Sequence, residues 1–565
     1  MLDDAEARAA ALCVHEVGIP TRDGIELAAD VYLPVSDQSP CAAVVFGTPY
    51  DKGDEVFTAP EAQIYRDAGY AAVVFDIRGR GKSEGVWHGN SLFDAYDGHD
   101  VVEWVGRQDW CTGDVGISGL SYGGWLVWAT ISQQPQHLRA AVSTSAVGRY
   151  MQEIPYIGGC FQLSCAAWLA SVRRRIADRS PEDIPSLLQT LPIQDIGASI
   201  ESASQIWEQY MQHDTLDEFW RRLRWDGEYG RFDVPCLHVT GWHDREDLHG
   251  AFHHYEHMVE HSPARDRQWL IVGPWSHLST RWPSAECGGI CYGQEAALDM
   301  HAIHLRFFDR FLRGRENGFE EEPRVRLFDT GTRGWRIRPR WQQTCAKARR
   351  FYLAPDGRLE GQPEGTGSDA YVYDPARPSG ISFDVTQIWE PPLDLGSFAA
   401  HPGVLAWRSD VLTTLLSAHG WPSATLFAAT DCEDTDWHVK LADLTPAGEL
   451  LTVAWGCLRA AHAEDLGTRQ AVNSGEVCRY EIELSPVFHT FLPGHRIVLL
   501  VASADWPWFA RNLNQRGPIA GQREIRIATN TIHHGCVRPS CVTLGIDADA
   551  RMGLGIGKPT PAGNT

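Results

Sequence analysis

The sequence predicts an α/β protein in which a parallel sheet is interrupted by a helical block and followed by an all-β domain. Short apolar runs alternate with helical segments in the first third, strand runs are absent from residues 148–232, and short alternating runs follow from residue 323. We expect the two parts of the α/β domain at residues 1–147 and 233–322, the helical insertion between them, and a β-sandwich at residues 323–565.

The first third of the chain has the pattern of a βαβ fold. Residues 28–33 (AADVYL) resemble a strand, and residues 41–47 (CAAVVFG) and 71–76 (AAVVFD) are short apolar runs typical of buried parallel strands. Between the last two, EAQIYRDAG has helical spacing and ends in Gly, which favours a left-handed helix stop. A helix at DAYDGHDVVEWVGRQ, a strand at VGISG and a helix at SYGGWLVWATISQ continue the alternation. We therefore expect a parallel sheet covered on both faces.

The helical block and the C-terminal half differ from this pattern. Segments such as SQIWEQYMQHDTLDEFWRRLRW place Trp, Tyr and charged residues at helical spacing. The strand, turn and helix pattern then resumes at residues 234–244 (VPCLHVTGWHD) and 267–277 (RQWLIVGPWSH), so the block is interpreted as an insertion. After the helix ALDMHAIHLRFFDRFLRG, alternating runs such as RVRLFDTG, WHVKLADLTPAG and HRIVLLVAS predict a β-sandwich.

Composition and charge exclude several classes of partner. Lys and Arg total 50 against 73 Asp and Glu, a net charge of −23, which disfavours binding to nucleic acid or to anionic membranes. The 14 cysteines are scattered without a CxxC, and Cys41, Cys236 and Cys457 lie in apolar runs, so we predict free thiols in a reducing compartment. With no leader pattern and no membrane-length apolar run, we expect a cytoplasmic protein; a homo-oligomer stays open.

The strongest local motif is the G-x-S-x-G from Gly119 to Gly123, which lies between an apolar strand and a helix. A sharp turn from strand to helix requires small residues beside the serine and leaves its hydroxyl exposed above the sheet. The N–H of Tyr122, at the start of the helix, would face a developing oxyanion. We therefore predict Ser121 as a nucleophile; the alternative is an ordinary Gly-rich turn.

A serine nucleophile needs an orienting acid and a base, which follow the serine in that order in this arrangement. Asp244 and His277 each follow an apolar strand, at the sheet edge where ligands bind in open α/β folds. We predict Asp244 as the acid and His277 as the base. Asp247 is the rival acid, an N-cap is the alternative role of Asp244, and a surface loop is the alternative place of His277.

A stripe of histidines is the one pattern that suggests a metal. His249, His253, His257 and His261 recur every four residues, and i, i+4 histidine pairs are able to bind zinc. No HExxH motif occurs in the sequence. We therefore expect a solvated helix face and no metal site.

Five motifs follow one another along the chain: GTPYDK from Gly47, DIRGRGKSEG from Asp76, GLSYGG from Gly119, GWHD from Gly241 and GPWSH from Gly273. Their order resembles that of the cocaine esterase and X-prolyl dipeptidyl peptidase family, and the resemblance continues through FFDRFLRG and GTRGW into the C-terminal half. It implies an α/β-hydrolase fold with an inserted helical cap domain and a C-terminal jelly-roll β domain around one shared pocket.

The resemblance also implies a role for Tyr50, whose hydroxyl would donate to the oxyanion beside the N–H of Tyr122. The alternative is a core aromatic at a strand end. Arg245 and Glu246 stand where the family commonly has apolar residues, which would alter the pocket wall. Aromatic residues of the cap are candidates for lining the pocket, although such spacing is also that of a core: Tyr150, Tyr156, Trp168 and Trp207.

Together these residues predict a serine hydrolase that cleaves a small-molecule ester or amide through an acyl-enzyme and needs no cofactor. One rival is X-prolyl or amino-acid ester hydrolysis, which requires an acidic site for the substrate ammonium; Glu153, Glu246 and Asp247 are available for it. Another is acyl transfer on the same triad. A binding protein that keeps the fold without turnover is the alternative outside catalysis.

Overall fold

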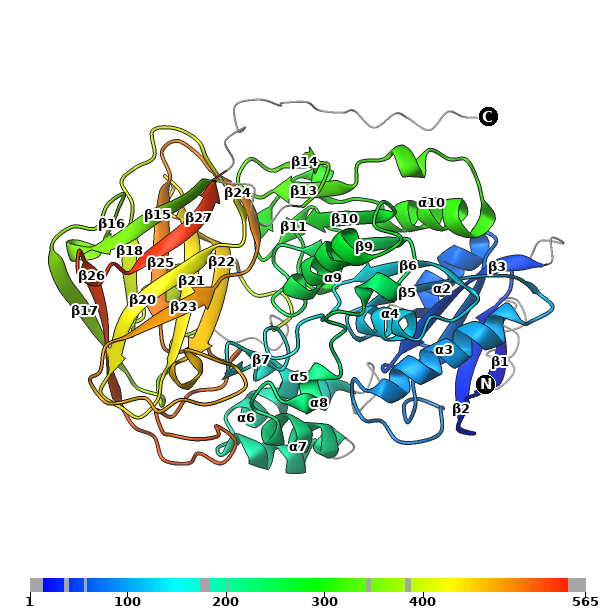
Figure 1. Ribbon diagram of the computed structural model, residues 1–565, viewed down its shortest axis with the longest axis horizontal. Helices are drawn as coiled ribbons and strands as arrows, with labels where there is room; N and C mark the ends of the chain where they lie inside the picture. Colours follow the sequence, from blue (N-terminus) through cyan, green and yellow to red (C-terminus); the bar gives the residue numbers. More distant parts are fainter. Residues whose placement is uncertain are drawn as a thin grey trace.

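Three parts of the molecule are visible in Figure 1: an α/β part coloured blue to green, a helical part in teal, and a β-sandwich from yellow-green to red. None of the helices that the structure describes has the length and apolar character needed to cross a membrane. The computed structural model describes residues 14–34, 40–54, 58–172, 183–200, 203–341, 347–381 and 388–546.

The α/β part is built on a 10-stranded sheet. Its central strands all run parallel, and antiparallel strands flank them on both sides. The predicted strands at residues 41–47 and 71–76 lie side by side in it. In spatial order the strands are β1 (Val14–Pro20), β2 (Glu26–Tyr32), β4 (Ala71–Asp76), β3 (Cys41–Thr48), β5 (Cys111–Leu120), β6 (Leu138–Thr144), β9 (Cys236–Gly241), β10 (Gln268–Gly273), β13 (Val325–Asp329) and β14 (Gly334–Arg338).

Helices cover both faces of this sheet, as the continuous apolar strands predict. Along β4, Ala71, Val73 and Phe75 enter the core on one face, whereas Ala72 and Val74 enter the core on the other. The first core also contains residues of α3 (Leu92–Gly106) and α4 (Tyr122–Ser132), and the second contains residues of α2 (Thr58–Asp67) and α10 (Met300–Arg313). A further helix, α9 (Leu248–His261), packs on β9 and β10.

The sheet extends past residue 322, where the sequence predicted the sandwich to begin. β13 pairs in parallel with β10, with Leu270 opposite Val325, and β14 returns antiparallel beside β13 (Figure 1). The segment RVRLFDTG is therefore a strand of the α/β sheet, which corrects the predicted domain limit. The alternation of apolar and polar residues does not show whether a strand belongs to the α/β sheet or to the sandwich, because a strand near a sheet edge and a sandwich strand have the same period.

The described residues between 148 and 232 form mainly helices, as predicted, and share their core with α3 and α4. They begin with a short hairpin that the sequence did not predict, because strands of two residues are too short to show a period. We call this part the cap. Its elements are β7 (Tyr156–Ile157), β8 (Cys160–Phe161), α5 (Ser164–Val172), α6 (Asp183–Leu188), η2 (Ile193–Ser199), α7 (Ser204–Gln212), α8 (Glu218–Arg221) and η4 (Tyr229–Arg231).

The C-terminal part is a β-sandwich with its own core, and its strands pair mainly antiparallel. A side-chain bond ties it to the α/β sheet, since the Thr490 hydroxyl donates to the carboxylate of Asp329 at 2.7 Å. Its strands are β15 (Lys347–Ala354), β16 (Arg358–Glu360), β17 (Thr366–Tyr373), β18 (Val404–Arg408), β19 (Leu416–Gly420), β20 (Ser423–Thr430), β21 (Asp436–Leu444), β22 (Leu450–Arg459), β23 (Cys478–Glu483), β24 (Val487–Phe491), β25 (Arg496–Ala502), β26 (Ala528–Gly535) and β27 (Cys541–Ile546). Three further short elements are β11 (Glu286–Cys287), β12 (Ile290–Cys291) and α11 (Gly396–Ala399).

Candidate active site

Ser121 occupies the sharp turn between β5 and α4, with φ 60° and ψ −121°. A serine in this left-handed region is strained, and such strain clusters at functional sites. The turn is closely packed: a Cβ on Gly119 would lie 2.2 Å from the backbone carbon of Gly123. The Ser121 N–H also donates to the carbonyl of Thr144 at 3.1 Å. The close approach of the backbone thus requires a glycine at position 119, as the G-x-S-x-G motif predicts for residues beside the serine.

Asp244 and His277 form a buried pair on the loops that follow β9 and β10. Nδ1 of His277 lies 3.1 and 3.2 Å from the two carboxylate oxygens of Asp244. Oδ1 of Asp244 also accepts the N–H groups of Glu246 at 3.0 Å and Asp247 at 3.1 Å, which fixes the carboxylate. The carboxylate of the rival Asp247 is farther away, at 3.9 Å from the same imidazole nitrogen. The geometry therefore favours Asp244 over Asp247 as the partner of His277.

One cavity of about 200 Å³ brings Ser121 and His277 together at the carboxyl ends of the parallel strands. Tyr50, Glu246 and Trp168 line the same cavity. Parallel strands all end at one edge of a sheet, which explains why residues far apart in the sequence meet here. The remaining lining residues are Phe46, Gly47, Thr48, Pro49, Thr58, Glu61, Ser118, Gly119, Leu120, Gly123, Ser171, Leu278, Arg281, Trp282 and Trp389.

Tyr50 and Tyr122 differ in what their side chains do. The Tyr50 hydroxyl accepts a hydrogen bond from Nε1 of Trp168 at 3.2 Å, which orients the phenol without using its proton. The Tyr122 hydroxyl is buried and donates to the carbonyl of Gly89 at 2.8 Å. The side chain of Tyr122 is thus structural, and its backbone N–H, at the first position of α4, is the donor next to Ser121.

Three further buried carboxylic acids lie around this pair. Oε2 of Glu246 is 3.3 Å from Nε2 of His277, and the charge of Glu153 acts on Asp247. Burial raises the pKa of Glu246 and of Glu153 to about 7, and it raises the pKa of Asp247 well above its usual range. Burial disfavours the imidazolium, but the surrounding carboxylates outweigh it and raise the pKa of His277 to about 10. The site therefore stabilises a positive charge.

Of the four cap aromatics predicted for the pocket, Trp168 lines the cavity. Tyr150, Tyr156 and Trp207 are buried in the cap core instead, at 2%, 1% and 0% exposure. Their polar groups point into the cap as well: the Tyr156 hydroxyl and Nε1 of Trp207 donate to backbone carbonyls of other cap segments. The expectation for these three is corrected. Tyr150 and Tyr156 lie in a turn and on β7, outside any helix, and for Trp207 on α7 helical spacing does not tell which side of the cap faces a cavity.

Trp389 and Arg281 are among the residues of the cavity to which the sequence did not point. Trp389 reaches it from the loop between β17 and β18 of the sandwich. Arg281 is buried beneath it, where it pairs with Glu61 at 2.5 Å and donates to the Thr144 hydroxyl at 2.9 Å. Trp389 and Arg281 lie in irregular segments, where no period marks a functional position, so no signal in the sequence identifies them.

The sandwich holds the loop that carries the acid. Arg245, directly after Asp244, donates to Oδ2 of Asp505, and the same oxygen accepts from Nζ of Lys440 at 2.6 Å. The guanidinium also lies 4.7 Å from the ring centre of Trp508. Burial lowers the pKa of Lys440 to about 8. Arg245 therefore joins the sandwich, whereas Glu246 is the residue that alters the pocket wall.

The histidine stripe lies on α9, as its spacing predicts, but the expected solvated face is wrong for its first half. His249 and His253 are buried, and His261 is exposed. Nε2 of His253 is 3.3 Å from Asp226, and potential ligand atoms of these two residues and His257 lie within 4.8 Å of one another. Arg224 binds the same carboxylate at 2.8 Å, so a positive charge already occupies the acidic ligand.

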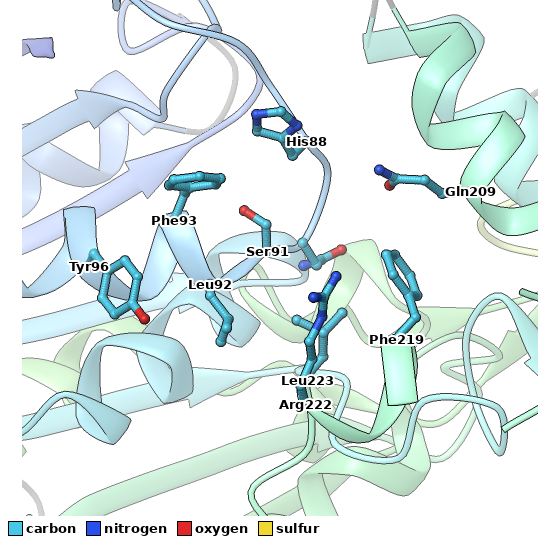
Figure 2. A pocket seen from close by; sticks show the side chains of 10 residues that line it. His88, Ser91, Leu92, Phe93, Tyr96, Gln209, Phe219, Arg222 and Leu223 are labelled. Carbon is cyan, nitrogen blue, oxygen red and sulfur yellow. The ribbon is translucent and has the colours of Figure 1, made fainter. Parts of the chain in front are cut away.

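A second cavity, of about 330 Å³, lies between the start of α3 and the cap helices α7 and α8. Figure 2 shows Phe93 and Ser91 on the α3 side, and Gln209 and Phe219 on the cap side. Its ionisable side chains are His88, Tyr96 and Arg222. It contains none of the predicted site residues, so the chemistry is assigned to the cavity beside Ser121.

The sequence matches known domains over most of its length. Residues 23–279 match the domain described as X-Pro dipeptidyl-peptidase (S15 family), and residues 317–543 match the X-Pro dipeptidyl-peptidase C-terminal non-catalytic domain. The chain is 30% identical to the cocaine esterase of Rhodococcus sp. (strain MB1 Bresler), across 94% of this chain and 98% of that protein.

Solved structures share the fold. An α-amino acid ester hydrolase superposes with a TM-score of 0.85 at 26% identity, over 94% of this chain and 96% of that chain. An aminopeptidase from the marine sediment archaeon Thaumarchaeota archaeon has the same TM-score and coverage at 24% identity. The α/β-hydrolase fold with a mostly β C-terminal domain is thereby confirmed.

Proposed function

The chain belongs to the cocaine esterase and X-Pro dipeptidyl-peptidase (S15) family of hydrolases, and from that premise we propose that it hydrolyses carboxylic esters through an acyl-enzyme on Ser121. The observation that carries the proposal is the buried Asp244–His277 pair, whose imidazole shares one cavity with a strained serine. A base oriented by an acid is what a serine hydroxyl needs to become a nucleophile.

The proposed reaction has two steps. Ser121 attacks the ester carbonyl while Nε2 of His277 takes its proton, and Asp244 holds the other nitrogen in the protonated tautomer. The Tyr50 hydroxyl and the Tyr122 N–H stabilise the oxyanion. His277 returns the proton to the leaving alcohol, then activates a water that cleaves the acyl-enzyme and restores the serine.

This proposal is tested by labelling and by products. A fluorophosphonate should label the wild-type protein on Ser121, and Ser121→Ala should abolish the label and lower turnover of a para-nitrophenyl ester by about 10⁶-fold. Labelling that persists in the variant places the nucleophile elsewhere, and a wild-type protein that neither labels nor turns over is a binding protein. Product analysis with an added alcohol or amine separates hydrolysis from acyl transfer.

The carboxylates around His277 favour a narrower substrate class, an ester whose acyl group carries an α-ammonium. Glu246 faces the cavity, and Asp247 and Glu153 stand behind it with raised pKa values. Buried acids whose ionisation is suppressed gain free energy when a cation approaches. The structurally similar α-amino acid ester hydrolase supports this substrate class.

A cationic substrate would also release the base. Without one, the positive charge favoured by Glu246 sits on His277, and a protonated imidazole accepts no proton from Ser121. An ammonium held by Glu246 would replace that charge and lower the pKa of His277. The substrate would thus activate the site that cleaves it.

Two esters that differ in one group test this narrower class. We expect the para-nitrophenyl ester of alanine to be cleaved with a higher kcat/KM than that of propionate at neutral pH. Glu246→Gln should reduce the ratio of the alanine ester's kcat/KM to the propionate ester's kcat/KM by about 10- to 100-fold, which corresponds to the loss of one hydrogen bond to a charged group. A ratio that does not change excludes Glu246 as the ammonium site while leaving ester hydrolysis intact. X-Pro anilides, run alongside, measure the peptidase alternative.

A further inference from the structure

A buried group of metal-ligating side chains lies where the cap meets the sandwich, away from Ser121. Potential ligand atoms of Cys160, Asp436 and His438 are all within 4.8 Å of one another. Cys457 stands opposite His438 in the β21–β22 ladder, and its thiol neighbours that of Cys160. We call the group the interface cluster; its four members are Cys160, Asp436, His438 and Cys457, exposed by 1%, 1%, 3% and 4%.

The strand register places three of these side chains on one face of the sandwich. Trp437 and Val439 point into the sandwich core, so Asp436 and His438 point the other way, towards the cap. Cys457 shares that face, because directly opposed residues of an antiparallel pair project to the same side. The sandwich therefore presents a carboxylate, an imidazole and a thiol side by side.

The cap hairpin supplies the fourth group. The N–H of Arg459 donates to the carbonyl of Gly158 at 2.8 Å, and the thiol of Cys457 lies 3.3 Å from the carbonyl of Ile157. Gly158 has φ +55°, and a Cβ there would lie 2.1 Å from the carbonyl oxygen of Cys457. Close docking of this turn on β22 thus fixes Cys160 over the sandwich face.

The chemistry of the cluster suits a metal better than an apolar contact. Nε2 of His438 is buried without a hydrogen-bond partner among the described residues, a costly state for a core nitrogen. An imidazole nitrogen without a hydrogen-bond partner is able to serve as a metal ligand. The amide of Asn512 donates to Oδ1 of Asp436 at 2.7 Å, an orienting bond, and the thiol of Cys160 hydrogen-bonds the same carboxylate. Arg459 stands opposite Asp436 on β22, but its guanidinium pairs with Asp434 at 2.5 Å.

We propose that the interface cluster binds one zinc ion, which fastens the cap hairpin to the sandwich. Cys160, Asp436 and His438 offer three ligand atoms that already lie within 4.8 Å of one another, and the thiol of Cys457, beside that of Cys160, would complete a four-ligand set for zinc. As each zinc–sulfur bond forms, the thiol releases its proton to solvent, and the carboxyl group binds as the anion. No electron transfer is involved. The site is separate from the ester chemistry, so the proposed function does not depend on it.

Metal content of the full-length protein provides the first test. Protein purified without a metal-affinity step and in the presence of zinc chloride should retain about one zinc per chain after desalting, measured by mass spectrometry of the elements. Cys160→Ala and His438→Ala should each weaken zinc binding by more than about tenfold. Cys541→Ala, which removes another buried thiol of the sandwich, is the matched control and should retain the metal.

A second measurement uses only the wild-type chain, in case the variants fold poorly. Cobalt chloride added to chelator-stripped protein should produce the strong near-ultraviolet absorption of cobalt–thiolate bonds, and zinc should abolish it and raise the melting temperature. Wild-type protein without bound zinc and without thiolate absorption overturns the proposal. So does zinc that remains in Cys160→Ala, or a disulfide between Cys160 and Cys457 in peptides of the purified protein.

Discussion

The cavity beside Ser121 has two walls that are positioned in different ways. On the sheet wall, formed by Tyr50, Ser121, Glu246 and His277, every residue stands within a few positions of the end of a parallel strand. On the outer wall, formed by Trp168, Ser171 and Trp389, the residues come from the cap and from a loop of the sandwich. A side chain at a strand end is placed by the direction of the strand alone. The positions of the side chains on the outer wall depend instead on how the cap and the sandwich pack against the sheet.

The largest effect is expected on the sheet wall. Asp244→Asn should leave the fold intact but favour the wrong tautomer of His277. We expect this to lower kcat by about 10⁴-fold. Turnover of the propionate ester measures it.

Asp247→Asn is the matched control, because its carboxylate lies farther from the imidazole, at 3.9 Å. We expect this control to lower propionate turnover far less than Asp244→Asn. A greater loss of turnover in Asp247→Asn would identify Asp247, three residues later, as the acid. The acid would then not be the residue that the end of β9 places beside His277.

Tyr50→Phe tests the point where the two walls touch, since Trp168 of the outer wall donates to the Tyr50 hydroxyl. The change removes one oxyanion donor and should lower kcat by about 10²- to 10³-fold with little change in KM. A tyrosine that only packs would instead lower the melting temperature and keep normal turnover per folded molecule. Trp168→Phe is the control that keeps the donor but removes its orienting bond, and its loss should be smaller.

A pH profile tests the charge on the sheet wall. The pKa of His277 is raised to about 10, so its neutral, reactive form is scarce at pH 7 and kcat/KM for the propionate ester should rise as the pH approaches 10. Glu246→Gln removes an anion that favours the imidazolium, so the rising limb should move to lower pH. Each unit of that shift raises activity at pH 7 about tenfold. A limb that stays in place would mean that Glu246 does not act on His277.

The smallest effect on turnover is expected from the sandwich. Asp505→Asn removes the anion between Arg245 and Lys440, which costs about 3–5 kcal/mol of stability and loosens the loop that carries Asp244, so turnover should fall by roughly tenfold.

Asp434→Asn is the control, because it breaks another buried ion pair of the sandwich, with Arg459 at 2.5 Å. It should lower the melting temperature similarly and keep turnover per folded molecule. Equal turnover losses in both variants would show that the ion pairs of Asp505 with Arg245 and Lys440 do not position the loop that carries Asp244.

Interactions between distant segments account for the expectations that needed correction. Tyr150 lies in a turn, Tyr156 on the short strand β7 and Trp207 on α7, and the packing of these separate segments decides which residue meets the cavity. The first half of the histidine stripe is buried for the same reason, since the cap and the sandwich cover α9 at His249 and His253. The limit after residue 322 was placed too early because β13 finds its partner in β10, which no local pattern records.

The sequence by itself determined the α/β sheet, its helical insertion and the strand ends that carry Tyr50, Ser121, Asp244 and His277, because apolar period, glycine turns and chain direction are local properties. Only the tertiary structure decided that Glu246 faces the cavity, that Arg245 joins the sandwich, and that Cys160 meets the face of β21 and β22. These contacts join parts of the chain that fold around different cores, and their free energy comes from burial and charge pairing that the spacing of residues does not encode.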